Sequence, residues 1–435
     1  MVFRRHIRAL GLVLPLVLVA APARAAQGID AGDTAWILVS TALVLFMTLP
    51  GLALFYGGLV RSKNVLSVLM QCFAISGVVS VLWLVYGYSL AFGPDVGGVV
   101  GGLGKALFAS VGLGSVSGTI PETVFAMFQL TFAIITPGLV IGAFAERTKF
   151  SAVLWFTVLW VTLVYAPITH WVWGGGWLGQ MGLLDFAGGT VVHVTAGAAA
   201  LVCALVIGRR KGFPDTPMPP HNMPLTVAGA GMLWVGWYGF NAGSALAANA
   251  NAGMALVATH MSASAGALTW MICEWRKFGK PSILGVVTGM VAGLGTITPA
   301  SGFVGPMGAL VIGILAGLIC FNATMLVKQR LQIDDSLDVF PVHGVGGMLG
   351  TLLAGVFASP TLGVFSGLGF AEGIDSVGGQ LGVQAVGVVA TFAYTAVATL
   401  VILKVIDATC GLRVDEEAEV QGLDLAMHEE RAYDL

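Results

Sequence analysis

The sequence predicts an all-α polytopic membrane protein with eleven transmembrane helices. The prediction depends on a very apolar composition, eleven long apolar segments and a regular alternation of basic residues between loops. Of the 435 residues, 57% are hydrophobic and 10% are charged, and the mean hydropathy is +0.90. These values lie outside the range of soluble globular proteins. A net charge of -2 offers no basic surface for nucleic acid.

The first 25 residues have the layout of a secretory signal peptide. Three arginines precede an apolar run over residues 9–21, and Ala-Arg-Ala at 23–25 provides a cleavage site. We expect residues 1–25 to be removed, so that the mature chain begins near Ala26 outside the cytoplasm. The alternative is a first transmembrane helix that is retained.

The rest of the chain contains eleven apolar segments of the length that crosses a hydrocarbon core, roughly 17–25 residues. They cover residues 34–57, 65–92, 120–145, 151–172, 188–208, 225–244, 254–273, 282–298, 304–327, 341–358 and 382–407.

Basic residues are concentrated in alternate loops between these segments. The even-numbered loops contain Lys105 alone. Because basic loops stay in the cytoplasm, the odd loops are predicted to be cytoplasmic, the N-terminus outside and the C-terminus inside. The basic residues of the odd loops are Arg61, Lys63, Arg147, Lys149, Arg209, Arg210, Lys211, Arg276, Lys277, Lys280, Lys328 and Arg330.

Two histidines occupy mirrored positions in the predicted helices. His193 follows Asp185 by eight residues in the fifth helix, and His343 opens the tenth helix after another Asp-containing segment. Because these helices run in opposite directions, two inverted five-helix repeats would bring both imidazoles to the midplane. Polar groups at that depth are costly and usually functional. Metal binding is the alternative, but neither histidine has a cysteine or a third histidine nearby in sequence.

The predicted organisation is a membrane domain over residues 26–407 with a tail at 408–435. The inverted repeats cover about 33–208 and 225–358, and the eleventh helix follows at about 382–407. The five cysteines contain no CxxC pair and are interpreted as small buried residues.

Aromatic residues recur at helical spacing in two of the segments, and a tryptophan lies at the outer end of a third. One face of aromatic rings is usually core packing, but rings near an opening also suit a small cation through cation–π attraction. The residues are Phe128 and Phe132 in the third helix, Trp173 at the end of the fourth, and Trp237 and Phe240 with Ser244 in the sixth.

Several motifs resemble those of the Amt/Rh/methylammonium permease superfamily, specifically its bacterial Amt branch. The resemblance runs in order from about residue 33 to the tail. The motifs are QLTFAIITPGLVIGAFAER, HWVWGGG, DFAGGTVVHVTAG, GWYGFNAGSA, ITPASGFVGP and DVFPVHGVGG.

The resemblance implies a role for each matching residue and a set of partners. It implies ammonium or ammonia as substrate, methylammonium as analogue, a homotrimer in the lipid bilayer of a bacterial inner membrane, and a PII-type signal protein at the cytoplasmic face. It implies neither catalysis nor a cofactor. The implied site comprises an outer recruitment site (Phe128, Trp173, Ser244), a stacked gate (Phe132, Phe240), pore-lining residues (His193, His343, Trp237) and Asp185, which holds the outer end of helix five and favours the cation.

Other polar residues of the helices have structural interpretations. We expect His260 to be structural and His170 to cap the outer end of the fourth helix. Glu146 and Arg147 are interpreted as anchors at a cytoplasmic helix end. Asp338 is expected to stabilise the start of the tenth helix through the helix dipole.

The tail is predicted to fold on the cytoplasmic face and to regulate transport, the alternative being a solvated acidic segment. Its spaced apolar residues provide the packing surface: Leu412, Val414, Val420, Leu423 and Leu425.

An apolar pore favours neutral NH3, because a bare NH4+ ion would lose its hydration. We expect ammonium to bind in the vestibule, to lose a proton near Asp185 and the gate, and to pass the histidines as NH3. A sodium-coupled amino-acid carrier, an ammonium sensor with little flux and a membrane-embedded hydrolase are the rival interpretations.

Overall fold

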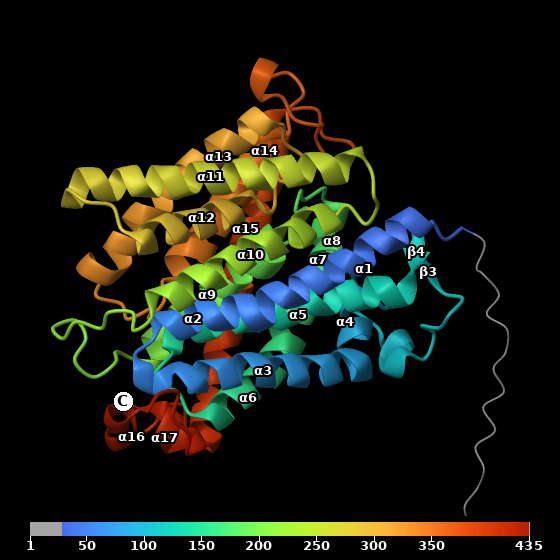
Figure 1. Cartoon of the computed structure of the whole chain (residues 1–435). Helices are drawn as coiled ribbons and strands as arrows, with labels where there is room; N and C mark the ends of the chain where they lie inside the picture. The colour runs from blue at the N-terminus through green and yellow to red at the C-terminus, as the bar shows by residue number, and fades with distance from the viewer. Residues whose placement is uncertain (1–27, 435) are drawn as a thin grey trace, which may run out of the picture.

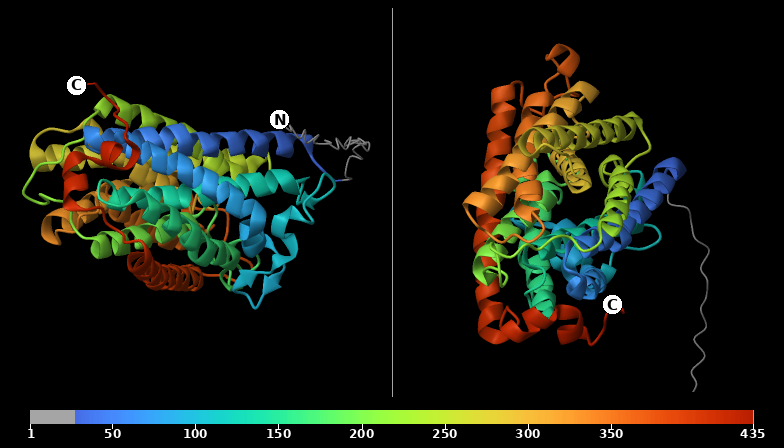
Figure 2. Two further views of the ribbon diagram at one scale, coloured as in Figure 1. Left: turned by 90° about the horizontal axis from the view of Figure 1, so that it is seen from below. Right: turned by 60° about the vertical axis from the view of Figure 1, so that its left-hand side comes forward.

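A computed structural model describes residues 28–434, which form a bundle of helices with one small helical tail. Most of the long helices run lengthwise, side by side (Figure 2), and the tail helices lie at one end of the bundle (Figure 1). We call this end the tail face; α1 (Ala31–Phe46) begins at the opposite end. The expected signal peptide at residues 1–25 lies outside the described residues.

The first half of the bundle is built from segments that often contain a short π-helical or 3-10 turn. Its helices are α1 (Ala31–Phe46), η1 (Met47–Leu52), α2 (Ala53–Leu59), η2 (Ser62–Asn64), α3 (Val65–Leu82), η3 (Trp83–Gly87), α4 (Tyr88–Phe92), α5 (Glu122–Phe144), α6 (Phe150–Trp160), η5 (Val161–Tyr165), α7 (Ala166–Val172), α8 (Trp177–Gln180), η6 (Gly189–Val194) and α9 (Thr195–Ile207).

The second half and the tail complete the chain. Their helices are α10 (Met223–Gly243), α11 (Ala250–Phe278), α12 (Ile283–Ile297), α13 (Pro306–Met325), η7 (Leu326–Arg330), η8 (Phe340–Gly344), α14 (Val345–Phe357), η9 (Gly363–Phe365), α15 (Val377–Thr409), α16 (Glu416–Gln421) and α17 (Leu423–His428).

Nine helical stretches within residues 28–434 are long and apolar enough to cross a membrane. Two further helices, α10 and the shorter apolar α12, occupy the positions where the sequence predicts the sixth and eighth segments. Large apolar side chains on the outer faces of the bundle are exposed, for example Val389 (67%) and Val397 (65%) on α15. Such a surface suits contact with lipid and identifies a multi-pass membrane protein.

The loop between α4 and α5 is more ordered than its glycine-rich sequence suggests. It contains two antiparallel hairpins, β1 (Asp95–Val96) with β2 (Val100–Gly101) and β3 (Val116–Ser117) with β4 (Ile120–Pro121), and the 3-10 helix η4 (Leu103–Phe108). The registers pair Asp95 with Gly101 and Val116 with Pro121.

His170 ties α7 to this loop. Its Nδ1 lies 2.9 Å from the carbonyl oxygen of Ala91, and its Nε2 lies 2.8 Å from Oδ1 of Asp95. The hydrogen bond to His170 is the main cause of the lowered pKa of Asp95. His170, in the last turn of α7, therefore joins this helix to the loop that follows α4.

Glu146 and Arg147, interpreted from the sequence as anchors at a helix end, directly follow the end of α5 and are interior residues. Both side chains are almost fully buried. Arg147 donates to the carbonyl oxygens of Ala143 (3.0 Å) and Asp334 (2.6 Å) and to Oγ of Ser336 (2.6 Å). Burial lowers the pKa of Arg147 to about 10.

A second buried arginine, Arg210, joins the same network. It forms ion pairs with Asp334 (2.7 Å) and Glu146 (3.0 Å). Burial opposes ionisation of both carboxyl groups, but the guanidinium outweighs it and holds the pKa of Asp334 and Glu146 below the usual range. The network fastens together the loops at the tail face that follow α5, α9 and α13.

The tail packs against this face as a folded segment. Asp424 accepts the backbone N–H groups of Leu66 (3.1 Å) and Ser67 (2.8 Å), and Leu423 is buried. Leu412 and Val414 are buried as expected, whereas Val420 is 55% exposed. The predicted docking of the tail is present, with Val420 outside the contact.

Candidate functional site

Three cavities follow one another along the bundle, and the sequence-predicted site residues lie in or beside them. The first, which we call the aromatic cavity, has a volume of about 330 Å³. The cavity lies near Ser244, which follows the C-terminal end of α10. The N-terminal end of α10 lies beside the tail, because Asn222 contacts Tyr433 there. The aromatic cavity therefore lies away from the tail face. Its lining residues are Phe92, Phe125, Gln129, Phe132, Val172, Trp173, Phe186, Ser244 and Leu246.

Trp173 and Ser244 both line the aromatic cavity, and both have local hydrogen bonds. The indole Nε1 of Trp173 donates to the carbonyl oxygen of Asp185 (2.9 Å), which fixes the ring. Oγ of Ser244 donates to the carbonyl oxygen of Phe240 (2.8 Å). Phe128, expected in the same recruitment site, is fully buried and is not part of the lining.

Two closely packed phenyl rings, which we call the Phe132–Phe240 stack although their planes are tilted by 37°, close the inner end of the aromatic cavity. The ring centroids of Phe132 and Phe240 are 4.3 Å apart, and both side chains are 1% exposed. Phe128 and Trp173 both pack edge-on against Phe132. Their ring centroids lie 5.0 Å and 5.9 Å from the Phe132 centroid, respectively. Phe128 thus supports the stacked pair from behind.

The histidine cavity begins beyond this stack. Nδ1 of His193 and Nδ1 of His343 lie 3.2 Å apart, and the two rings are stacked with their planes 15° apart. The Trp237 ring stacks on the His193 ring with their centroids 5.6 Å apart. The indole Nε1 of Trp237 donates to Oγ1 of Thr298 (2.9 Å). Nε2 of His193 is buried and has no hydrogen-bond partner among the described residues.

The histidine cavity is narrow and apolar. Its volume is about 10 Å³, close to the least space that holds one water molecule. Apart from Tyr56, Trp237 and the histidines, its lining consists of hydrocarbon side chains and one thioether: Met47, Leu52, Phe55, Ile135, Leu139, Val192, Leu233, Phe240 and Val291.

Asp185 holds the start of the helix that carries His193. Its carboxylate accepts the backbone N–H groups of Gly188 (2.8 Å), Gly189 (2.5 Å) and Thr190 (2.8 Å), and the hydroxyl of Thr190. Both oxygens are thus occupied by donors, as in a helix N-cap. Asp185 lines none of the three cavities, so the expected proton transfer near it has no free carboxylate oxygen to use.

Asp335, rather than Asp338, holds the start of the helix that carries His343. Asp335 lies eight residues before His343, the same spacing as Asp185 to His193, and its Oδ2 accepts the N–H of Phe340 (2.7 Å). Asp338 instead forms an ion pair with Lys328. Asp338 does lie at the helix entry, where its carbonyl oxygen accepts the N–H of Val342 (3.1 Å), but its carboxylate does not cap the helix. The sequence spacing contained the signal that identifies Asp335.

Two glycines allow the histidine helices to meet. A Cβ atom on Gly197 would overlap the backbone of Gly344, and one on Gly347 would press against the side chain of His193. Larger residues at these positions would separate η8 from α9, and α14 from η6. The close approach brings the two imidazoles within hydrogen-bonding distance.

The third cavity opens at the tail face and has a volume of about 320 Å³. We call it the tail-face cavity. His343 and Tyr56 line both it and the histidine cavity, so the two adjoin. Six further polar lining residues come from the second half of the chain: Glu274, Thr288, Thr324, Lys328, Ser336 and Asp338. None of them is predicted from the sequence to belong to a site.

His260 lies outside all three cavities. Its Nδ1 lies 2.7 Å from the hydroxyl of Tyr238, and its ring stacks on Trp234 at 5.3 Å. Within residues 28–434, no group of three or more histidine, cysteine, aspartate or glutamate residues is arranged to hold a metal ion.

Comparison with known proteins identifies the family. The model of the Ammonium Transporter Family matches residues 35–433. The chain belongs to the ammonium transporter family. An ammonium transporter of Aquifex aeolicus is 48% identical over 431 residues, which cover 98% of this chain and 99% of that protein. An ammonium transporter of Bacillus subtilis is 46% identical over 404 residues, covering 92% and 98%.

Solved structures of the family have the same fold. The structure of a protein named Sensor Amt Protein has a TM-score of 0.85 at 30% identity and covers 91% of this chain and 98% of its own. Mep2 of Saccharomyces cerevisiae has a TM-score of 0.82 at 37% identity, covering 90% and 89%.

Proposed function

We propose that this ammonium transporter family member conducts ammonium or ammonia across a bacterial cytoplasmic membrane. The observation that carries the proposal is the histidine pair. Two imidazoles 3.2 Å apart lie in an apolar cavity of about 10 Å³, between the wide aromatic cavity and the wide tail-face cavity. This space fits a substrate the size of one water molecule.

The aromatic cavity is the proposed recruitment site for NH4+. The ring faces of Trp173 and Phe132 attract a cation, and the Ser244 oxygen can accept an N–H from it. Phe128, buried behind Phe132, holds that ring in position. The cation thereby keeps favourable contacts while it sheds part of its water.

The Phe132–Phe240 stack is the proposed gate. A charged ion beyond it would meet a cavity with almost no hydrogen-bond acceptors, and desolvation would cost many kcal/mol. Neutral NH3 avoids that cost, so ammonium gives up its proton at the gate to water in the aromatic cavity, and NH3 enters the histidine cavity. Asp185 contributes by capping the His193 helix and through the field of its negative charge, while Trp237 lines the cavity and supports His193.

His193 and His343 then offer nitrogen atoms to the NH3 molecule. A proton can follow on the imidazoles, in which case transport is electrogenic, or stay outside. Uptake and current measured together in proteoliposomes distinguish these cases. Ammonium-dependent current or uptake in the wild-type protein supports the proposal, and the lack of both under a defined gradient contradicts it.

The same experiment separates the rival functions. A sodium-coupled carrier would move amino acids and leave methylammonium outside, and a sensor would show little flux. One similar solved structure is that of a protein named Sensor Amt Protein. The name describes that protein and does not assign a sensing role to this chain. The narrow histidine cavity favours a small substrate over an amino acid.

The proposed architecture has eleven transmembrane helices in a domain at residues 26–407. Two inverted five-helix repeats, about 33–208 and 225–358, precede the eleventh helix, and residues 1–25 are a cleaved signal peptide. The tail face is cytoplasmic. Reporter fusions after Arg210 and Leu435 should then report cytoplasm, and a fusion near Ala248 the outside; a periplasmic signal at Leu435 would contradict the helix count.

The proposed assembly is a homotrimer with a PII-type nitrogen signal protein as a partner of the tail at residues 408–435. The docked position of α16 and α17 supports a regulatory tail, because a partner that bound these helices would act directly on the loops beneath them.

A further inference from the structure

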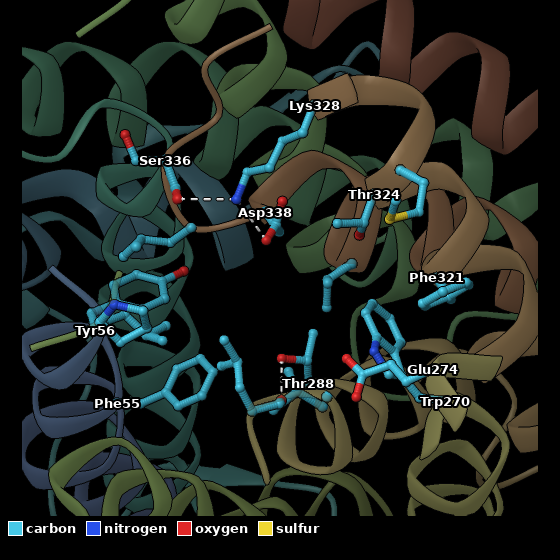
Figure 3. A pocket seen from close by; sticks show the side chains of 18 of the residues that line it. Phe55, Tyr56, Trp270, Glu274, Thr288, Phe321, Thr324, Lys328, Ser336 and Asp338 are labelled. Atoms are coloured by element: carbon cyan, nitrogen blue, oxygen red, sulfur yellow. Dashed lines mark hydrogen bonds and ion pairs between the residues drawn. The ribbon is translucent and has the colours of Figure 1, made fainter. Parts of the chain in front are cut away.

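The side chain of Lys328 ends in the tail-face cavity and is held there by two oxygen atoms. Its Nζ donates to Oδ2 of Asp338 (2.9 Å) and to the carbonyl oxygen of Ser336 (3.3 Å), as Figure 3 shows. The Lys328 and Asp338 side chains are 29% and 21% exposed, so the pair is only partly open to solvent. A lysine terminus is chemically an alkylammonium ion with three N–H donors.

Asp338 keeps acceptor capacity that Lys328 does not use. Its Oδ1 is buried and has no hydrogen-bond partner within residues 28–434. The residue also has a φ of +60°, which is uncommon for a residue other than glycine. Such a conformation persists where the surroundings hold it, and here it directs the carboxylate into the cavity.

The position of this carboxylate relates it to the histidine pair. Asp338 lies five residues before His343 in sequence, and both line the tail-face cavity. A molecule that leaves the histidine cavity past His343 enters the space that contains Asp338. Aromatic rings of Phe55, Tyr56 and Phe321 line the same space. The surroundings thus suit a small cation with N–H donors.

We propose that Asp338 and the Ser336 carbonyl form an ammonium site at the cytoplasmic mouth, and that the Lys328 ammonium group occupies it as a tethered substitute for the free ion. The inference deepens the proposed function and depends on it. A group on a short flexible stem competes at an effective concentration in the roughly millimolar range. Free ammonium therefore takes the site only when its cytoplasmic concentration is high, and the site limits further entry under those conditions.

The test uses purified full-length protein and methylammonium, which has the same –NH3+ group as lysine. In Lys328→Met the stem keeps its approximate length and loses its charge, so Asp338 is left for a free cation. Methylammonium chloride should raise the Tm of Lys328→Met by about 3 °C more than that of the wild type. Tetramethylammonium chloride at equal concentration should not, because it has no N–H donor.

Two further variants serve as matched controls. Lys328→Arg keeps a tethered cation, and the double variant Lys328→Met with Asp338→Asn removes the carboxylate; neither should gain the methylammonium effect. If Lys328→Met folds poorly, its folded yield should recover when methylammonium is added during purification. Equal responses of the wild type and Lys328→Met, or a recovery equally produced by tetramethylammonium, overturn the inference.

Flux in the wild type is measured in parallel. A wild-type protein without ammonium flux would refute the proposed function, whereas Tm shifts report the Asp338 site independently of flux. The two failures are therefore distinguishable.

Discussion

The Nδ1 atoms of His193 and His343 lie 3.2 Å apart, so one ring must donate a proton to the other. In the neutral pair the donor ring keeps an acceptor at Nε2, and the acceptor ring carries an N–H at Nε2. The two rings therefore present one acceptor and one donor to the cavity. Ammonia has both a lone pair and N–H groups, so it can bind to either ring in turn.

Removal of either ring should damage transport without preventing assembly. His193→Ala and His343→Ala each leave the remaining imidazole without its partner and enlarge a cavity of about 10 Å³. We expect electrogenic ammonium flux to fall by a large factor, or selectivity to relax toward K+. Currents in proteoliposomes with ammonium or potassium gradients measure both.

His260→Ala is the control for these variants, because His260 packs on Trp234 and Tyr238 away from the three cavities. It should conduct like the wild type. Normal ammonium currents and normal exclusion of K+ in both pore variants would reclassify the histidine pair as structural.

Trp173 should determine affinity for the cation more than turnover. A cation–π contact is worth about 0.5–2 kcal/mol, so Trp173→Leu should raise the KM for ammonium roughly 2–30-fold with little change in maximal rate. Trp173→Phe keeps a ring and should lose less. Trp275→Leu, at a position 57% exposed, is the control. Unchanged KM in Trp173→Leu would remove this residue from the recruitment site.

Asp335 should make folding stability depend on pH. Burial raises its pKa to about 6, and the charge of Asp338 contributes; Lys328 and the Phe340 N–H partly offset this rise. Because the folded pKa is above the unfolded one, the native state binds more protons between about pH 4 and 6. The free energy of unfolding of the wild type, measured relative to that of Asp335→Asn, therefore falls by about 1 kcal/mol as the pH rises from 5 to 7.

Denaturant unfolding in detergent micelles at pH 5, 6 and 7 measures this difference. Other titrating groups are common to both proteins and largely cancel in the comparison. A difference in stability that stays constant, or that grows in favour of the wild type with pH, would show that the Asp335 carboxyl is ionised throughout.

The positions of the helices and of the histidine pair could be predicted from the sequence, because both depend on local patterns. A membrane requires long apolar segments, and each is visible by itself. His193 and His343 stand out because a polar side chain in such a segment is rare. The equal spacing of eight residues from Asp185 to His193 and from Asp335 to His343 can also be read directly from the sequence.

Contacts between distant loops were not predictable in the same way. Glu146, Arg147 and Arg210 look like ordinary charged residues at helix ends, and only the fold shows that they share one buried network with Asp334. Asp338 looks like a helix-entry residue because the tenth helix is nearest in sequence, whereas its partner Lys328 is ten residues earlier, across a turn. Sequence distance does not reveal which carboxylate faces the cavity.

Arg210 should be essential for stability. Arg210→Met would leave Asp334 and Glu146 buried with reduced compensation, and loss of one partner from such a network costs about 3–5 kcal/mol. We expect a large fall in the yield of folded protein. Arg209→Met, at the exposed neighbouring position, should be close to wild type. Equal yields of the two variants would mean that the network contributes little.

The docked tail should depend on Asp424. Its carboxylate accepts the N–H groups of Leu66 and Ser67 at the start of α3, and burial raises its pKa. Asp424→Ala removes both bonds and should undock α17, so that a protease cuts the tail faster than in the wild type. Asp434→Ala, at an exposed position near the chain end, should be cut at the wild-type rate.

Deletion of Val414–Leu435 tests whether the docked tail also regulates transport. The deletion removes α16 and α17 together with the contacts that Glu419 makes to Lys211 and Arg413. Since these contacts hold the loops beneath the tail, we expect ammonium uptake to change and binding of a PII-type protein to be lost. If uptake and PII-type binding both stay at wild-type levels, the tail has no regulatory role, even though it is folded against the bundle.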